Sequence, residues 1–303
     1  MSRQPALPAS GTTLLRDVVA LIRPHEYVKN GFVCVGPVFA QRWQAATLVA
    51  VGLAFLAFCA AASSAYVFND ILDAEADRRH PVKNRRPIAR GAISVPFALR
   101  LCACLAVLAG LAAFCAGVPV LAIVAAYLLL NFAYSRWLKH VVILDVFVIA
   151  AGFMLRILSG TTGVGIPPSR WLLLTGLMLT LFLGFGKRRA ELLTLESESP
   201  AAPTSRPVLG QYSPDVLDLF LGITAACTIL SYGLYTVSSD TIAIHHGSHL
   251  FYSVPLVVYG IFRYVFLLHR RSPRPEATRD LLADPHLILV VLAWLALTAV
   301  LLS

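Results

Sequence analysis

The sequence predicts an all-α, polytopic membrane protein whose helices form one bundle. Its 303 residues are 58% hydrophobic and only 14% charged, and several windows exceed the ~20 apolar residues that cross a bilayer. The net charge is +9, but Lys and Arg gather between the apolar windows, which indicates membrane topology and no nucleic acid partner. The six cysteines lie in apolar stretches without ligand spacing, so we expect neither a disulfide nor a structural metal.

Nine transmembrane helices are expected within a single domain of residues 14–303. Residues 1–13 are polar and small, and they are predicted to form a disordered tail. The first span is short, because its apolar part ends near Ala40 and two prolines, Pro24 and Pro37, bracket it. The other spans are expected at roughly 45–69, 96–116, 119–137, 142–162, 171–187, 215–237, 250–268 and 286–302.

The distribution of Lys and Arg predicts the orientation in the membrane. Every such residue falls in segments on one side, except Arg42 and Arg170 on the other side and Arg100 and Arg156 within spans. Because positive residues stay on the cytoplasmic side, we expect a multi-pass plasma (inner) membrane protein with a cytoplasmic N-terminus. The same orientation places the candidate active site at the cytoplasmic ends of the helices.

The most polar stretch is residues 69–91, which follow an uncharged run that ends at Phe68. If the helix of that run continues to residue 77, Glu75 points away from the other acids. One face then carries four oxygen-bearing side chains: Asn69, Asp70, Asp73 and Asp77. Carboxylates this close are tolerated when a divalent cation takes up their charge, and hard oxygen ligands predict Mg²⁺ bridged to substrate phosphates. The alternative is a charged cytoplasmic loop that only orients the spans.

Residues 69–77 read Asn-Asp-x-x-Asp-x-x-x-Asp at the end of a hydrophobic span. This pattern resembles the first aspartate motif of the UbiA superfamily of intramembrane prenyltransferases. The basic continuation through Lys83 and Arg86 to Gly91 resembles one branch, the decaprenyl-phosphate phosphoribosyltransferases. The resemblance implies a UbiA-like bundle with a cytoplasm-facing active-site cavity and Mg²⁺ as its cofactor.

Two further segments resemble family signatures. The pattern Arg-Pro-x-x-x-x-Lys-Asn, which ends in Lys29 and Asn30, resembles the N-terminal signature, and Tyr134-Ser-x-x-Leu-Lys139 resembles a segment that reaches back into the active site. For both, the alternative is anchoring of aromatic and cationic side chains at the membrane interface.

The fifth predicted span carries an arginine at depth. Asp145, Gly152 and Arg156 lie on one helical stripe, and Arg156 is ~16 Å along the helix from Asp145. An arginine within a span costs roughly 2.5–3.5 kcal/mol, so it should face a cavity or a partner. We favour anion binding over the alternative, a structural pair with an acid from another helix.

The sixth predicted span ends in Lys187-Arg188-Arg189-Ala190-Glu191. Prenyltransferases of the superfamily carry a second aspartate motif in this loop, and the segment here has three cations and one glutamate instead. The departure weakens an aromatic-prenyltransferase interpretation and favours the phosphoribosyltransferase branch. The alternative for the three cations is that they only keep this end of the helix in the cytoplasm.

Together, these motifs predict catalytic roles for Asp73, Asp77 and Arg156. Substrate binding is predicted for polar and cationic side chains at the same end of the bundle: Lys29, Tyr66, Lys83, Arg86, Tyr134, Lys139, Lys187, Arg188 and Glu191. The pattern leaves open which cation holds which phosphate.

The resemblance implies a Mg²⁺-dependent transfer of the 5-phosphoribosyl group from 5-phosphoribosyl 1-diphosphate to a polyprenyl phosphate, for synthesis of a cell-envelope arabinose donor. One alternative is transfer of a prenyl group from a prenyl diphosphate to an aromatic or other acceptor. Another is a non-catalytic carrier of anionic lipids, although the one-sided polar cluster is unlike a transport path. The sequence leaves a homo-oligomer open.

Overall fold

The computed structural model describes residues 11–80, 82–197, 207–245, 247–270 and 284–302. Within these ranges all the regular structure is helical, as expected. The first half of the chain forms α1 (Gly11–Ile22), the 3-10 helix η1 (Pro24–Cys34), α2 (Val35–Phe39), α3 (Ala45–Arg79), η2 (Lys83–Arg85), α4 (Val95–Ala116), α5 (Val118–Arg136) and η3 (Leu138–His140).

The second half continues with α6, which follows η3 directly, and ends with α12. Its helices are α6 (Leu144–Ser159), η4 (Thr162–Val164), α7 (Arg170–Ser197), η5 (Pro207–Gln211), α8 (Pro214–Thr236), α9 (Ser239–His245), η6 (His249–Ser253), α10 (Val254–Arg270) and α12 (Pro285–Leu302). The predicted tail overlaps α1, which begins at Gly11, and residues 1–10 lie outside the described ranges.

Eight helices of the described chain are long and apolar enough to cross a membrane, and they match the second to ninth predicted spans. The predicted first span takes a different form, because η1 is a 3-10 helix and α2 has only five residues. Pro24 and Pro37 at its two ends interrupt regular α-helical hydrogen bonding. A 3-10 helix rises about 2 Å per residue, so η1 and α2 together reach about 30 Å.

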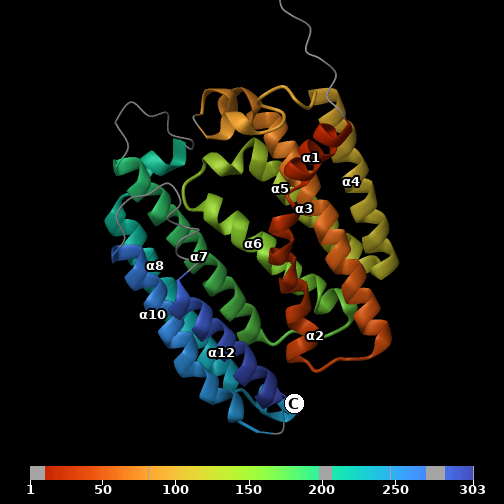
Figure 1. The fold of residues 1–303 in the computed structure, drawn as a ribbon. Coiled ribbons are helices and arrows are strands. Elements are labelled where there is room, and N and C mark those ends of the chain that lie inside the picture. The colour runs from red at the N-terminus through yellow and green to blue at the C-terminus, as the bar shows by residue number, and fades with distance from the viewer. Residues whose placement is uncertain (1–10, 81, 198–206, 246, 271–283, 303) are drawn as a thin grey trace, which may run out of the picture.

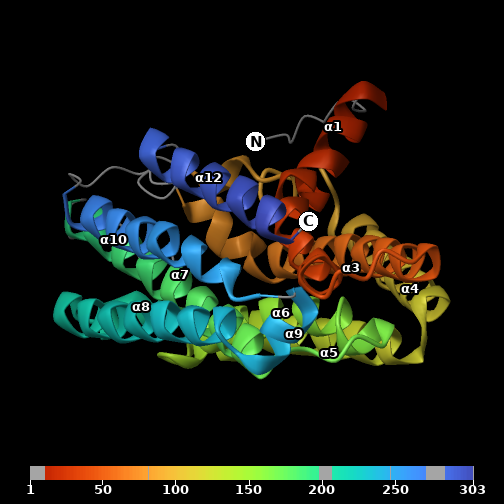
Figure 2. The same ribbon diagram turned by 90° about the horizontal axis from the view of Figure 1, so that it is seen from below.

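Figure 1 shows how these elements are arranged. Helices α3, α4 and α5 form one side of the bundle, and α7, α8, α10 and α12 form the other. Helix α6 lies between the two sides and packs on both α5 and α7. Figure 2 views the same arrangement from below and shows α12 beside α10, on the face of the bundle that also carries α1.

Helix α3 is the element that positions the candidate site. It has 35 residues, which at 1.5 Å per residue is about 52 Å and exceeds the ~30 Å hydrocarbon layer. Its apolar part is rich in buried Ala and Ser, such as Ala57, Ala61 and Ser64, and small residues let neighbouring helices approach closely. The excess length carries the acidic residues beyond the apolar part of the bundle.

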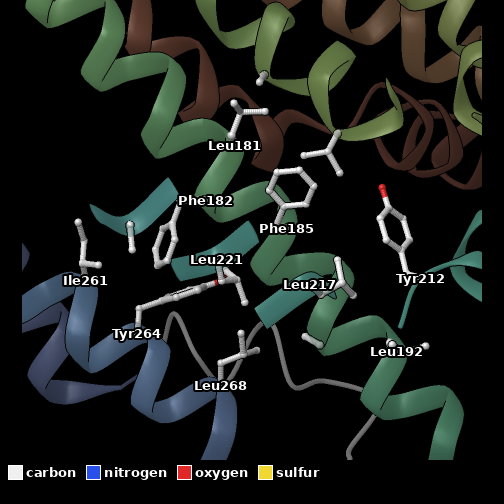
Figure 3. Close-up of a cluster of buried hydrophobic side chains, with 14 of the residues drawn as sticks. Leu181, Phe182, Phe185, Leu192, Tyr212, Leu217, Leu221, Ile261, Tyr264 and Leu268 are labelled. Atoms are coloured by element: carbon white, nitrogen blue, oxygen red, sulfur yellow. The ribbon is translucent and has the colours of Figure 1, made fainter. Parts of the chain in front are cut away.

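Each side of the bundle has its own apolar cluster, which packs the helices of that side together. One joins α3, α4 and α5 around Phe58 and Tyr127. The other joins α6, α7, α8 and α10 around Phe182, Phe185 and Tyr264 (Figure 3). The polar groups described below connect these two sides at one end of the bundle.

A close backbone contact fixes η1 against the end of α6. A methyl group at Gly160 would lie 1.7 Å from the carbonyl oxygen of Val33. We therefore expect Gly160→Ala to destabilise the protein by about 3 kcal/mol or more, because the backbone must move to admit the methyl group. Thermal unfolding in detergent measures the effect. Gly110→Ala is the matched control, since a methyl group there meets nothing within 4 Å, and equal unfolding temperatures for the two variants would contradict the close contact.

Candidate active site

The acidic residues lie on one face of α3, as the register predicts. The helix continues without interruption to Arg79, so Asp70, Asp73 and Asp77 project from the same side. Glu75 projects elsewhere, where it is exposed and pairs with Arg78 and Arg79 of its own helix. Helical periodicity alone therefore separates three site carboxylates from one surface carboxylate.

Two of the three carboxylates are buried and bound by arginines. Asp70 accepts hydrogen bonds from Arg23 at 2.7 and 2.9 Å and from Arg86 at 3.0 Å. The same Arg86 nitrogen also donates to Asp77 at 2.7 Å. The guanidinium of Arg23 lies over the ring of Tyr66, 5.2 Å from its centroid. Arg86 thus bridges two carboxylates, as a planar guanidinium with several donors can.

Asp73 is the accessible member of the acidic face. Its side chain is 30% exposed, against 2% for Asp70. It accepts from the Lys139 ammonium at 2.5 Å and from the Asn69 amide at 2.9 Å. Lys139 belongs to η3, so the structure brings together two predicted segments that are far apart in the sequence.

The oxygen-bearing side chains on the acidic face of α3 can bind Mg²⁺ only when a substrate supplies the remaining ligands of the ion. Within the described ranges, no group of three or more His, Cys, Asp and Glu side chains is gathered as a metal site, because basic side chains separate the carboxylates. Mg²⁺ typically takes one or two carboxylates and adds water and substrate phosphates. Asn69 and Asp73 are only partly buried, and their oxygens match that mode of binding.

A second polar cluster joins the start of α6 to the end of α7 and to Tyr212, which lies between η5 and α8. Arg188 is almost fully buried, and it donates to Asp145 at 2.7 Å and to Glu191 at 2.6 Å. The sequence predicts that Arg188 binds substrate, whereas the structure pairs its guanidinium with two carboxylates of the protein. Lys187 is half-exposed, 3.9 Å from Glu191, and remains directed to the surface. Removing one partner of a buried ion pair lowers the free energy of unfolding by about 3–5 kcal/mol. The pair between Arg188 and Asp145 therefore holds α7 against α6.

Tyr212, which follows η5, completes this second cluster. Its hydroxyl donates to Asp145 at 3.0 Å and accepts from the backbone N–H of Ile143 at 2.6 Å. Burial raises the pKa of Tyr212, and the neighbouring carboxylate of Asp145 adds to the increase. The hydroxyl therefore stays neutral and keeps both hydrogen bonds at physiological pH.

Arg156 lies in a separate buried site within α6. Its guanidinium donates to Asn30 at 2.7 Å, to the Gly152 carbonyl at 2.8 Å and to the Tyr127 hydroxyl at 3.0 Å. The rings of Phe58, Tyr127 and Phe153 surround it at 4.7 to 5.5 Å. Its hydrogen-bond partners among the described residues are all neutral, so the structure does not show the alternative of a pair with an acid from another helix. Aromatic faces stabilise such a cation.

The remaining predicted residues lie near the same end of the bundle. Lys29 pairs with Glu26 of η1, and the charge of Lys187 also acts on Glu26. Lys83 lies in η2, the turn that also presents Arg86. Tyr134, at the end of α5, is close enough to act electrostatically on Arg188. These contacts come from four different segments of the chain.

Arg23 and Asn30 are site residues that the sequence reasoning left out of its substrate-binding set. Both belong to the Arg-Pro-x-x-x-x-Lys-Asn pattern, so a signal was present. From this pattern the sequence predicts a substrate-binding role for Lys29 alone, since a lysine ammonium suits phosphate. The structure instead gives the buried contacts to the two ends of the pattern, Arg23 on Asp70 and Asn30 on Arg156.

The fold and this geometry define a class: an intramembrane helical bundle with a carboxylate face and basic side chains at one end. The family model of the UbiA prenyltransferase family matches residues 31–284. The chain belongs to the UbiA prenyltransferase family. The resemblance seen in residues 69–77 is thereby confirmed.

Two relatives in different organisms bear the same name. The chain is 34% identical over 231 residues to the decaprenyl-phosphate phosphoribosyltransferase of Corynebacterium glutamicum. The matched region covers 73% of this chain and 68% of that protein. It is 32% identical over 291 residues to the protein of the same name from Mycobacterium tuberculosis, which covers 93% of each. These names match the branch that the basic continuation of the motif indicated.

A solved structure is similar in fold. The UbiA homolog from Archaeoglobus fulgidus bound to GPP and Mg²⁺ superimposes with a TM-score of 0.68 at 17% identity, covering 94% of this chain and 99% of that chain. At this identity the likeness concerns the fold alone.

Proposed function

We propose that this protein transfers the 5-phosphoribosyl group from 5-phosphoribosyl 1-diphosphate to a polyprenyl phosphate of the decaprenyl type and releases diphosphate. The relatives named above support the substrates. The observation that carries the proposal within this chain is the segment 187–191. Its one carboxylate, Glu191, is held by Arg188, so it does not offer the second acidic motif that a prenyl diphosphate would need.

The acidic face of α3 is proposed to receive the diphosphate of the donor. Asn69 and Asp73 would hold Mg²⁺, which would neutralise a diphosphate leaving group when bound. Asp70 and Asp77, which the sequence also predicts as metal ligands, pair with Arg23 and Arg86. Lys139 and Arg86 contact Asp73 and Asp77 at 2.5 and 2.7 Å. Both can turn their donors to the diphosphate oxygens and stabilise the negative charge that grows as the bond to the anomeric carbon breaks.

The acceptor needs little activation by the protein. A polyprenyl phosphate already carries a nucleophilic oxyanion, so no general base is required. The half-exposed Lys187 and Lys29 are proposed to orient this phosphate or the 5-phosphate of the donor. The apolar tail of the acceptor would extend into the bilayer beside the bundle. Following the positive-inside distribution, we place this site on the cytoplasmic side of the plasma (inner) membrane.

Label transfer tests the proposed reaction. The purified protein in detergent is incubated with Mg²⁺, labelled 5-phosphoribosyl 1-diphosphate and decaprenyl phosphate, and label is followed into the organic phase. We expect label there with Mg²⁺ and none after chelation. Parallel reactions receive labelled prenyl diphosphate and aromatic acceptors. Turnover only in those reactions would overturn the donor assignment and make the protein an aromatic prenyltransferase.

A further inference from the structure

The loop between α5 and α6 contains a strained residue close to the active site. Ile143 has φ 68° and ψ −49°, and a β-branched residue rarely adopts a positive φ because its Cβ crowds the backbone. The N–H of Leu144 donates to the carbonyl of Val142 at 2.7 Å, so Ile143 is the centre of a tight γ-turn. Such a conformation persists only where surrounding contacts hold it.

The hydroxyl of Tyr212 provides these contacts. It accepts from the N–H of Ile143 at 2.6 Å and donates to Asp145 at 3.0 Å, so one hydroxyl group binds both the turn and the start of α6. Figure 3 shows the ring of Tyr212 at the edge of the apolar cluster, with its oxygen pointing away from the labelled apolar side chains. A phenylalanine would keep the packing and lose both bonds.

The turn is connected on either side to groups of the active site. Lys139, four residues before Ile143, contacts Asp73 at 2.5 Å. The other oxygen of Asp145 accepts from Arg188 at 2.7 Å. Because η3 is short, the turn at Ile143 sets the path by which the loop enters α6 and therefore the place of Lys139.

We propose that Tyr212 is a positioning residue, whose hydroxyl holds the Ile143 turn and thereby keeps Lys139 at Asp73. The effect on catalysis rests on the proposed function, whereas the effect on the loop does not. Tyr212 acts only through Lys139 and the start of α6.

Hydrogen exchange tests the effect on the loop without any substrate. In Tyr212→Phe we expect the amides of residues 138–146 to exchange about tenfold faster, because both hydrogen bonds of the Tyr212 hydroxyl are lost and each contributes only modestly to stability. The matched control is Tyr264→Phe, which removes a hydroxyl from the same apolar cluster at a distance from the loop and should leave this segment unchanged. Equal exchange in wild type and Tyr212→Phe would overturn the proposal even if the protein proves to have another activity.

A double-mutant cycle tests the effect on the reaction. Tyr212→Phe should lower kcat about tenfold, but it should add less than about twofold when Lys139 is already alanine, because both changes act through one group. Multiplying losses would show that Tyr212 only stabilises the fold. Ile143→Gly, added to Tyr212→Phe, should restore kcat to within about threefold of wild type, because glycine adopts a positive φ without strain. Absence of that rescue would contradict the role of the strained turn. If wild type transfers no phosphoribosyl group, the proposed function fails, and hydrogen exchange alone decides the role of Tyr212.

Discussion

Asp73→Asn is expected to lower phosphoribosyl transfer by at least ~10³-fold while the bundle stays folded. Asp73 is the most exposed carboxylate of the acidic face and contacts Lys139 and Asn69. An asparagine keeps the size of the side chain and removes the negative charge, so it cannot balance a divalent cation bridged to the donor diphosphate. Label transfer into decaprenyl phosphate, measured over a range of Mg²⁺ concentrations, checks the result.

The control for this variant is Glu75→Gln on the same helix. It makes the same exchange of carboxylate for amide, but Glu75 is 66% exposed, and among the described residues its bonds are to Arg78 and Arg79. We expect it to change transfer by less than about twofold. Wild-type activity in Asp73→Asn, or equal losses in the two variants, would remove the acidic face from the mechanism.

Arg156→Met is expected to lower transfer by at least ~100-fold with little change in the unfolding temperature. The buried guanidinium has neutral partners, Asn30, Tyr127 and the Gly152 carbonyl. Burying an unpaired charge costs desolvation free energy, and its removal offsets the hydrogen bonds and aromatic contacts that methionine loses, so the net change in stability is expected to be small. We therefore infer that the cation serves anion binding, and kcat/KM together with thermal unfolding in detergent measures both effects.

Arg100→Met is the matched control for the second prediction. Arg100 also lies within a predicted span, but it is exposed on α4, and within the part of the chain that the structure describes it donates to the carbonyl of Pro96. Its replacement should leave transfer within about twofold of wild type. If Arg156→Met instead has a much lower unfolding temperature and normal activity per folded molecule, the role of Arg156 is structural.

Much of the fold follows from short-range properties of the chain. Hydropathy over ~20 residues identified the spans from α3 to α12, because every residue of a lipid-facing helix must avoid exposing polar groups to hydrocarbon. The first span departed from its prediction. Its prolines are visible in the sequence, but the close backbone contact of η1 with Gly160 joins segments far apart in the chain, and no local pattern contains it.

For the candidate site, too, some features follow from local sequence and others depend on tertiary contacts. By itself, the sequence determined the membrane class, the span positions and the common face of Asp70, Asp73 and Asp77, because helical periodicity is a property of consecutive residues. Only the tertiary structure decided their partners: Arg23 and Arg86 on Asp70, and Lys139 on Asp73.

Tertiary packing also decides which basic residues at the end of α7 are buried. From the sequence, Lys187 and Arg188 are equivalent neighbouring cations. In the fold, Lys187 stays half-exposed, whereas Arg188 is buried against Asp145 of another helix. Adjacent residues on a helix point about 100° apart, and which direction meets a partner depends on helices that pack there from distant parts of the chain. The sequence shows which residues are charged, but the packing of distant helices decides which of those charges are buried and which residues they pair with.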